Sequence, residues 1–158
     1  MDTPTATTNL LPLRLLVQFQ QRCPDTEPEL VLQAPGRDLW MMAMLNTSGR
    51  VALASVELNA RTVLSAHSAR YKRTMLHRPL PKWSRYAAGV LISLDDSNLT
   101  VSGLTAVVGG DEPVGPRYEY TLGVLMAGLI YTVNQQSFTH SKLFEIADRA
   151  RRDYVENR

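Results

Sequence analysis

Residues 111–129 constrain the fold more than any other stretch of this chain. An apolar run of strand length, residues 104–108, leads into a turn rich in Gly and Pro, and an apolar helix pattern follows over 118–133. A strand, a turn and a helix in this order place the free N–H groups and the positive dipole end of the helix at the turn. Proteins bind phosphate at such a place, so the layout is that of an anion-binding turn.

The residues that fill this turn do not suit phosphate. Pro116 has no N–H to donate. Tyr118 and Tyr120 add bulk where a backbone would have to approach the anion closely, and Glu119 adds negative charge. The sequence therefore indicates the fold more clearly than the present function. What it says about function is mainly an argument against phosphate binding at this turn.

Composition and charge limit the classes of function. The 158 residues suffice for one domain, and a formal net charge of +2 is too small for a nucleic-acid surface. One cysteine, Cys23, excludes an internal disulfide. We see no secretory signal and no apolar run near the roughly 20 residues of a membrane span. We therefore expect a cytoplasmic protein with no nucleic-acid or membrane partner, a disordered segment at 1–9 and a single domain at 10–158.

The periodicity of apolar residues predicts an α+β fold. Helices are expected over 10–22, 81–94, 118–133 and 139–154. Strands are expected over 30–33, 38–45, 51–58, 61–68 and 101–108, with a short edge strand at 74–77. Such elements form a two-layer domain with a mixed or mainly antiparallel sheet and helices packed on one face. Gly123 and Gly128 weaken the helix at 118–133, so we expect both to pack closely on a neighbour.

Four motifs in this order resemble the N-terminal half of a galactokinase, in the GHMP small-molecule kinase superfamily. They are Ala-Pro-Gly-Arg at 34–37, Trp-x-x-Tyr-x-x-Gly-Val at 83–90, the strand and turn at 103–115, and Arg-Ala with Tyr-Val within 149–155. The resemblance covers about residues 10–157. It implies the fold of a GHMP-kinase N-terminal domain and, if the chain is active, ATP-dependent sugar phosphorylation with Mg-ATP as cofactor.

The sugar-binding positions of that family have changed here. The resemblance aligns the family's Glu, His and Asp, which hold sugar hydroxyls, with Ala43, Met44 and Asn46. Two hydrogen-bonding side chains have become apolar and one carboxylate has become an amide. A site that recognises hydroxyls through paired polar groups loses most of its discrimination when those groups are replaced.

The phosphate loop of the family aligns with residues 113–122 and is also altered. Gly115 and Thr121 preserve one glycine and one hydroxyl, whereas Arg117 replaces the second glycine and Glu119 replaces a serine. We expect Arg117 to pair with Glu119.

Of the family's catalytic pair only Arg37 is present, because the segment that carries the catalytic aspartate in the family has no counterpart before Arg158. Arg37 is the one relic of a catalytic residue, and we expect it to form a structural ion pair or a cap.

These departures favour a degenerate, non-catalytic galactokinase-like domain that acts as an assembly or regulatory module without a cofactor. The alternative is the N-terminal part of a GHMP sugar kinase that binds Mg-ATP and sugar when a second chain or half completes it. A small-molecule sensor that uses the old cleft is a third possibility. No metal site is expected, since His67, His77 and His140 lack ligand spacing.

Because the helix at 118–133 and the strand at 38–45 are apolar on nearly every side, we expect an apolar face that needs a cover. A homodimer or another protein partner is the expected cover. The alternative is that the N-terminal helix folds over this face within the same chain.

Overall fold

A five-stranded mixed sheet forms the middle of the molecule. The computed structural model describes residues 12–157. The strands lie in the order β1-β2-β5-β3-β4, and only the pairing of β5 with β3 is parallel. Their bounds are Leu30–Gln33 for β1, Leu39–Leu45 for β2, Val51–Ser55 for β3, Ala60–Leu64 for β4 and Leu104–Gly110 for β5. The α+β class and the mainly antiparallel sheet are thus confirmed.

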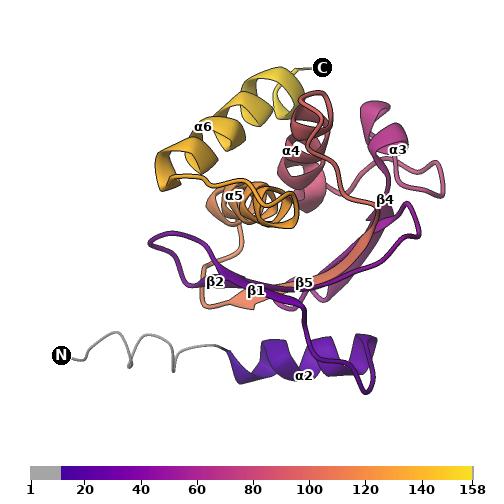
Figure 1. The fold of residues 1–158 in the computed structure, drawn as a ribbon, viewed down its shortest axis with the longest axis vertical. Helices are drawn as coiled ribbons and strands as arrows, with labels where there is room; N and C mark the ends of the chain where they lie inside the picture. The colour runs from indigo at the N-terminus through magenta and orange to yellow at the C-terminus, as the bar shows by residue number, and fades with distance from the viewer. Residues whose placement is uncertain (1–11, 158) are drawn as a thin grey trace.

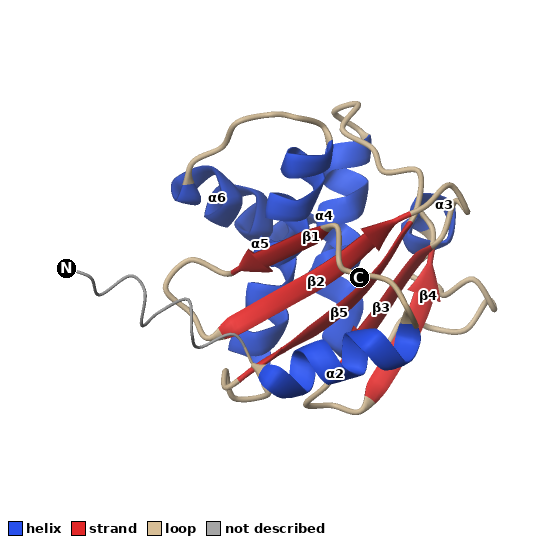
Figure 2. Ribbon diagram, turned by 60° about the horizontal axis from the view of Figure 1, so that its bottom comes forward, coloured by secondary structure: helices blue, strands red, loops and turns tan. Residues whose placement is uncertain are grey.

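Helices lie on both faces of this sheet (Figures 1 and 2). On one face lie α4, α5 and α6, as predicted, and α2 crosses the opposite face. The helix bounds are Leu13–Arg22 for α2, Ala66–Arg70 for α3, Arg85–Asp95 for α4, Pro116–Val133 for α5 and His140–Ala150 for α6. A 3₁₀ turn, Lys82–Ser84, leads into α4, and a π turn, Arg151–Val155, continues α6.

Two strand predictions between 61 and 77 are wrong. The strand expected over 61–68 ends at Leu64, because Ser65 caps α3: its Oγ accepts a hydrogen bond from the N–H of Ser68. The edge strand expected at 74–77 is a tight turn, in which the N–H of Thr74 donates to the carbonyl of Arg78 and His77 has a left-handed φ of 63°. The segment predicted to be disordered, 1–9, lies outside the described residues.

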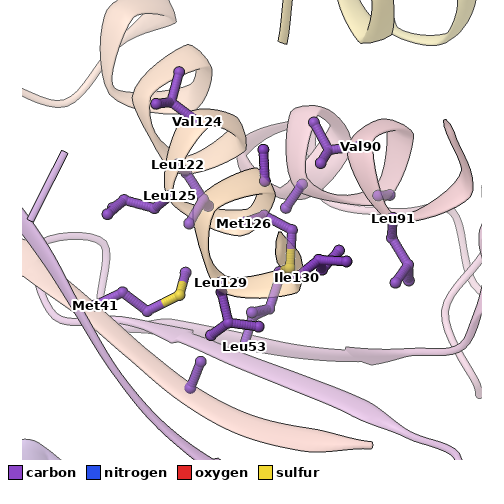
Figure 3. Close-up of a cluster of buried hydrophobic side chains, with 14 of the residues drawn as sticks. Met41, Leu53, Val90, Leu91, Leu122, Val124, Leu125, Met126, Leu129 and Ile130 are labelled. Carbon is purple, nitrogen blue, oxygen red and sulfur yellow. The ribbon is translucent and has the colours of Figure 1, made fainter. Parts of the chain in front are cut away.

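Helix α5 is the centre of the main core. Leu122, Leu125, Met126 and the residues after them fill the space between the sheet and α4 (Figure 3). The helix also packs against α6. Its apolar character on all sides is therefore explained by burial within the chain, since it has the sheet on one side and two helices on the other.

The opposite face of the sheet is covered by α2. Leu15 and Phe19 are both fully buried there, against Trp40 and Met42 of β2 and Val107 of β5. This is the alternative arrangement considered from the sequence, in which the N-terminal helix covers the apolar face. The motive for a covering partner is thereby removed, and the homodimer stays a prediction.

The two glycines of α5 differ in their surroundings. A Cβ on Gly123 would lie 3.0 Å from the Cβ of Tyr86 in α4, so the predicted close packing is confirmed there. A Cβ on Gly128 would lie 3.5 Å from the nearest atom, Leu143 Cδ1, which is an ordinary contact. Close packing of Gly128 was therefore a wrong prediction.

Candidate functional site

The turn between β5 and α5 opens onto a cleft of about 600 Å³. Three segments line this cleft: the turn after β1, the first turns of α5 and the inner side of α6, with Tyr86 of α4 between them. Its polar and aromatic lining includes Arg37, Tyr86, Arg117, Tyr120, Thr121, Asp148 and Arg151. A second hollow of about 610 Å³ lies beside it and is lined by Arg37, Asp38 and residues 111–117.

Helix α5 begins without a side-chain cap. Gly115 precedes it with a φ of 150°, a conformation that favours glycine, and Pro116 is its first residue. The N–H groups of Arg117 and Tyr118, in the first turn, have no acceptor within the helix. The geometry of an anion-binding helix end is thus present, as the sequence predicts.

A buried carboxylate lies at this helix end. The side chain of Glu112 is only 6% exposed, and its Oε1 lies 3.9 Å from Nη1 of Arg37. The N–H of Glu112 donates to the carbonyl of Asp38, which holds the turn in place. The ion pair expected for Arg37 is therefore present. The carboxylate of Glu112 offsets the positive charge of Arg37, which would otherwise attract an anion.

Tyr118 points inward from the first turn of α5. Its hydroxyl lies 2.5 Å from Ser55 Oγ at the end of β3 and donates to Glu57 Oε1 at 3.1 Å. Burial raises the pKa of Tyr118 far above its usual value. The other oxygen of Glu57 accepts from the N–H of Gly110 at 3.3 Å and pairs with Arg14 of α2 at 3.2 Å. This network fixes the end of β5 and the start of α5 to the strand beside them.

Tyr120 fills one side of the cleft. Its hydroxyl lies 3.1 Å from Oδ1 of Asp148 and 3.3 Å from the carbonyl of Phe144. Its ring meets Tyr86 edge-on, with centroids 5.6 Å apart. Burial raises the pKa of Tyr120 to about 12. Arg151 pairs with Asp148 at 3.4 Å, so these three polar side chains of the cleft, Tyr120, Asp148 and Arg151, are joined to one another.

One further relic of the phosphate loop, Thr121, is engaged within the chain. The hydroxyl of Thr121 donates to the carbonyl of Arg117 at 2.6 Å. Burial raises the pKa of Glu119, although the positive charges of Lys82 and Arg85 act in the opposite direction. Within residues 12–157 Glu119 forms no ion pair with Arg117, so the predicted pair is wrong: the nearby positive charges are Lys82, in the turn before α4, and Arg85, the first residue of α4.

The three altered sugar positions lie apart from the cleft. Ala43 is fully buried in β2 and faces Ala106 across the ladder. Met44 packs on the side of α2. Asn46 lies in the turn after β2, where its Oδ1 accepts from the N–H of Ser48 at 3.0 Å. The tertiary structure therefore does not bring these positions together with Arg37.

Several residues of the site have no signal in the sequence. Glu57 and Asp148 belong to no motif, and nothing in the turn motif marks Glu112 as buried. Arg151 lines the cleft without a signal of its own. Only contacts between distant elements show their role. Residues 12–157 contain no cluster of three or more His, Cys, Asp or Glu that could hold a metal ion. In the same residues no helix is both long and apolar enough to cross a bilayer.

Comparisons by sequence find no matching family model and no matching curated protein. Solved structures do match. A galactokinase from Lactococcus lactis, complexed with galactose, superposes with a TM-score of 0.60 at 15% identity, over 78% of this chain and 31% of the kinase. The mevalonate kinase of Methanococcus jannaschii gives 0.55 at 6% identity, over 72% and 36%. A D-glycero-D-manno-heptose 1-phosphate kinase from Bacteriodes thetaiotaomicron gives 0.52 at 13% identity, over 73% and 36%.

These likenesses show the fold. The chain has the α+β architecture of a GHMP-kinase N-terminal domain and spans about a third of the length of the kinases it matches. The resemblance noted from the motifs is thus confirmed at the level of architecture. Identities of 15% and below carry no activity across.

Proposed function

We propose that this chain is a degenerate, non-catalytic GHMP-kinase-like domain that acts as an assembly or regulatory module. The observation that carries the proposal is the buried carboxylate of Glu112, in the turn between β5 and α5, paired with Arg37. Glu112 and the first residues of α5 line the same hollow, so a phosphate at this helix end would meet the repulsion of a like charge.

Two further features support the loss of phosphoryl transfer. Asp111 and Glu119 place more negative charge on either side of the helix end. The hydroxyls of Tyr118 and Thr121 are directed to partners within the chain rather than to a ligand. Phosphoryl transfer depends almost entirely on positioning and on positive charge around the phosphate, and this turn provides little of either.

The remaining architecture suits a rigid binding module. The cleft is ordered by the chain of contacts from Tyr120 through Asp148 to Arg151, and α2 is tied to the same end of the sheet through Arg14 and Glu57. A preorganised surface loses little entropy on binding. A second copy or another protein in the cytoplasm is the partner that this proposal expects.

Nucleotide binding and turnover test the proposal directly. Calorimetric titration of the full chain with Mg-ATP should give no heat of binding, and coupled assays with galactose or mevalonate should give ADP at the rate of the no-protein control. A Kd in the millimolar range or tighter, or ADP formation that Arg37→Ala abolishes, would show that the chain is an active kinase domain.

The small fraction of the kinases' length that this chain covers favours a second candidate function. Between 72% and 78% of this chain matches kinases of which it covers only 31–36%, so a second chain or half could supply the remainder of an active site. This candidate predicts that Mg-ATP binds only after such a partner is added. Mg-ATP binding that appears only in the co-purified complex would favour it over the non-catalytic module.

A further inference from the structure

Another cavity lies at the far edge of the sheet and shares no residue with the cleft or with the hollow beside it. It has a volume of about 530 Å³ and lies between β4, the edge strand, and the segment from Thr74 to Pro81. Three arginines line it together with an apolar wall. The lining residues are Arg50, Arg61, Thr62, Val63, Thr74, Met75, Leu76, Arg78, Pro79 and Pro81.

The three arginines have no acidic partner among the described residues. Arg50, Arg61 and Arg78 are all exposed, and in residues 12–157 none of them forms an ion pair. By contrast Arg14, Arg37, Arg70, Arg149 and Arg151 are each paired with a carboxylate. The cavity therefore has three arginines in its lining whose charge no carboxylate of the described residues pairs with.

The segment that forms the outer wall has a fixed structure. The N–H of Met75 donates to the carbonyl of Val63 at 2.9 Å, which attaches the segment to β4. Within it, the Thr74 N–H donates to the Arg78 carbonyl at 2.8 Å, and the guanidinium of Arg73 donates to the carbonyl of His77 at 2.8 Å. The wall is thus held by several hydrogen bonds, and Arg78 lies on it at a defined place.

The inner wall offers hydrogen-bonding groups of its own. Because Val63 directs its carbonyl to Met75, the alternation of an antiparallel ladder directs the backbone groups of Val63 and Arg61 away from β3, toward the cavity side.

We propose that this cavity binds a small phosphate monoester that carries an apolar group. Three guanidinium groups match the charge of about −2 on a phosphate monoester near neutral pH, and arginine binds phosphate oxygens in a bidentate manner. Met75, Leu76, Pro79 and Pro81 offer an apolar surface beside these charges; Leu76 is 77% exposed. The proposal does not depend on the proposed function, since the cleft at α5 contributes nothing to it.

The test is a titration of the full chain followed by backbone amide NMR at constant ionic strength. The probes are phenyl phosphate, inorganic phosphate and benzoate. We expect saturable shifts of the amides of Val63, Met75 and Leu76 with phenyl phosphate, and weaker binding of inorganic phosphate, which has no apolar group. Arg61→Gln and Arg78→Gln should each weaken phenyl phosphate binding by about tenfold, as the loss of a charge-assisted hydrogen bond does.

A matched variant controls for the net charge. Arg152 is exposed, does not line the cavity and has no ion pair among the described residues, so Arg152→Gln makes the same charge change elsewhere and should leave the Kd unchanged. Equal weakening by all three variants, shifts that do not saturate, or shifts outside this cavity would overturn the site. Benzoate binding as tight as phenyl phosphate would overturn the assignment of a phosphate.

Discussion

The hydroxyl of Tyr118, in the first turn of α5, lies 2.5 Å from Oγ of Ser55, the last residue of β3, and both side chains are buried. Glu57 accepts a second hydrogen bond from the same hydroxyl. The helix end where an anion site was expected is therefore attached to the sheet by a side chain of its own.

Removal of that hydroxyl should destabilise the fold. We expect Tyr118→Phe to lower the free energy of unfolding by about 1–3 kcal/mol, because Ser55 and Glu57 lose a partner in a buried place. A urea titration followed by circular dichroism measures this. Tyr120→Phe is the control, because water can reach the edge of the cleft and replace its hydrogen bonds; it should cost less than about 1 kcal/mol. Equal midpoints for both variants and the parent would contradict the role of the Tyr118 network.

Glu119 should make stability depend on pH. Burial raises its pKa above 4.5 in the folded chain, so the folded state binds more protons than the unfolded state between the two values, and stability falls as pH rises through that window. Glu119→Gln should therefore raise the melting temperature at pH 7, and the difference should vanish near pH 4. Thermal unfolding at several pH values tests this.

Glu145 provides a control of opposite sign. A hydrogen bond from Lys142 lowers the pKa of Glu145, so its contribution to stability is present above pH 4.5 and is lost as pH falls. Glu145→Gln should not raise the melting temperature at pH 7. A rise of the same size in both variants would show that removal of any negative charge, rather than burial of Glu119, is the cause.

The two glycines of α5 should respond differently to alanine. Gly128→Ala should stabilise the protein by about 0.5–1 kcal/mol, because alanine favours the helix and its Cβ meets only an ordinary contact with Leu143. Gly123→Ala should destabilise it, since its Cβ would press on Tyr86 at 3.0 Å. Chemical denaturation of the two variants decides this, and a stabilising Gly123→Ala would show that α4 and α5 can move apart.

Loss of the contact between α2 and the sheet should expose to solvent the apolar face of the sheet that α2 covers. Phe19 is fully buried, so Phe19→Ala should cost about 3–5 kcal/mol and increase self-association. Leu13→Ala is the control, because Leu13 is 73% exposed on the same helix and should change stability by less than about 0.5 kcal/mol. Light scattering measures the self-association of both variants. Applied to the parent chain it also tests the homodimer, which a mass of 17.6 kDa would refute.

The sequence by itself determined the elements whose patterns are local. The apolar run at 118–133 predicts the central helix because a helix apolar on all sides must be buried. The apolar stripe at 81–94, with its 3.6-residue period, predicts α4. The strands at 30–33 and 38–45 lie almost where apolar runs and the turn residues beside them place them. The capping box at Ser65 has Ser68 where the usual pattern has Glu or Gln, so the end of β4 carries no strong local signal.

Only the tertiary structure decided which charged and polar groups meet. Glu112 pairs with Arg37, Tyr120 with Asp148, and Tyr118 with Ser55, and each pair joins elements that are distant in the sequence. No periodicity encodes such contacts, because they depend on how the sheet and helices pack. The position of α2 on the opposite face, the dispersal of Ala43, Met44 and Asn46, and the arginine-lined cavity follow from the same packing. Secondary structure is specified by neighbours along the chain, whereas a site is specified by neighbours in space.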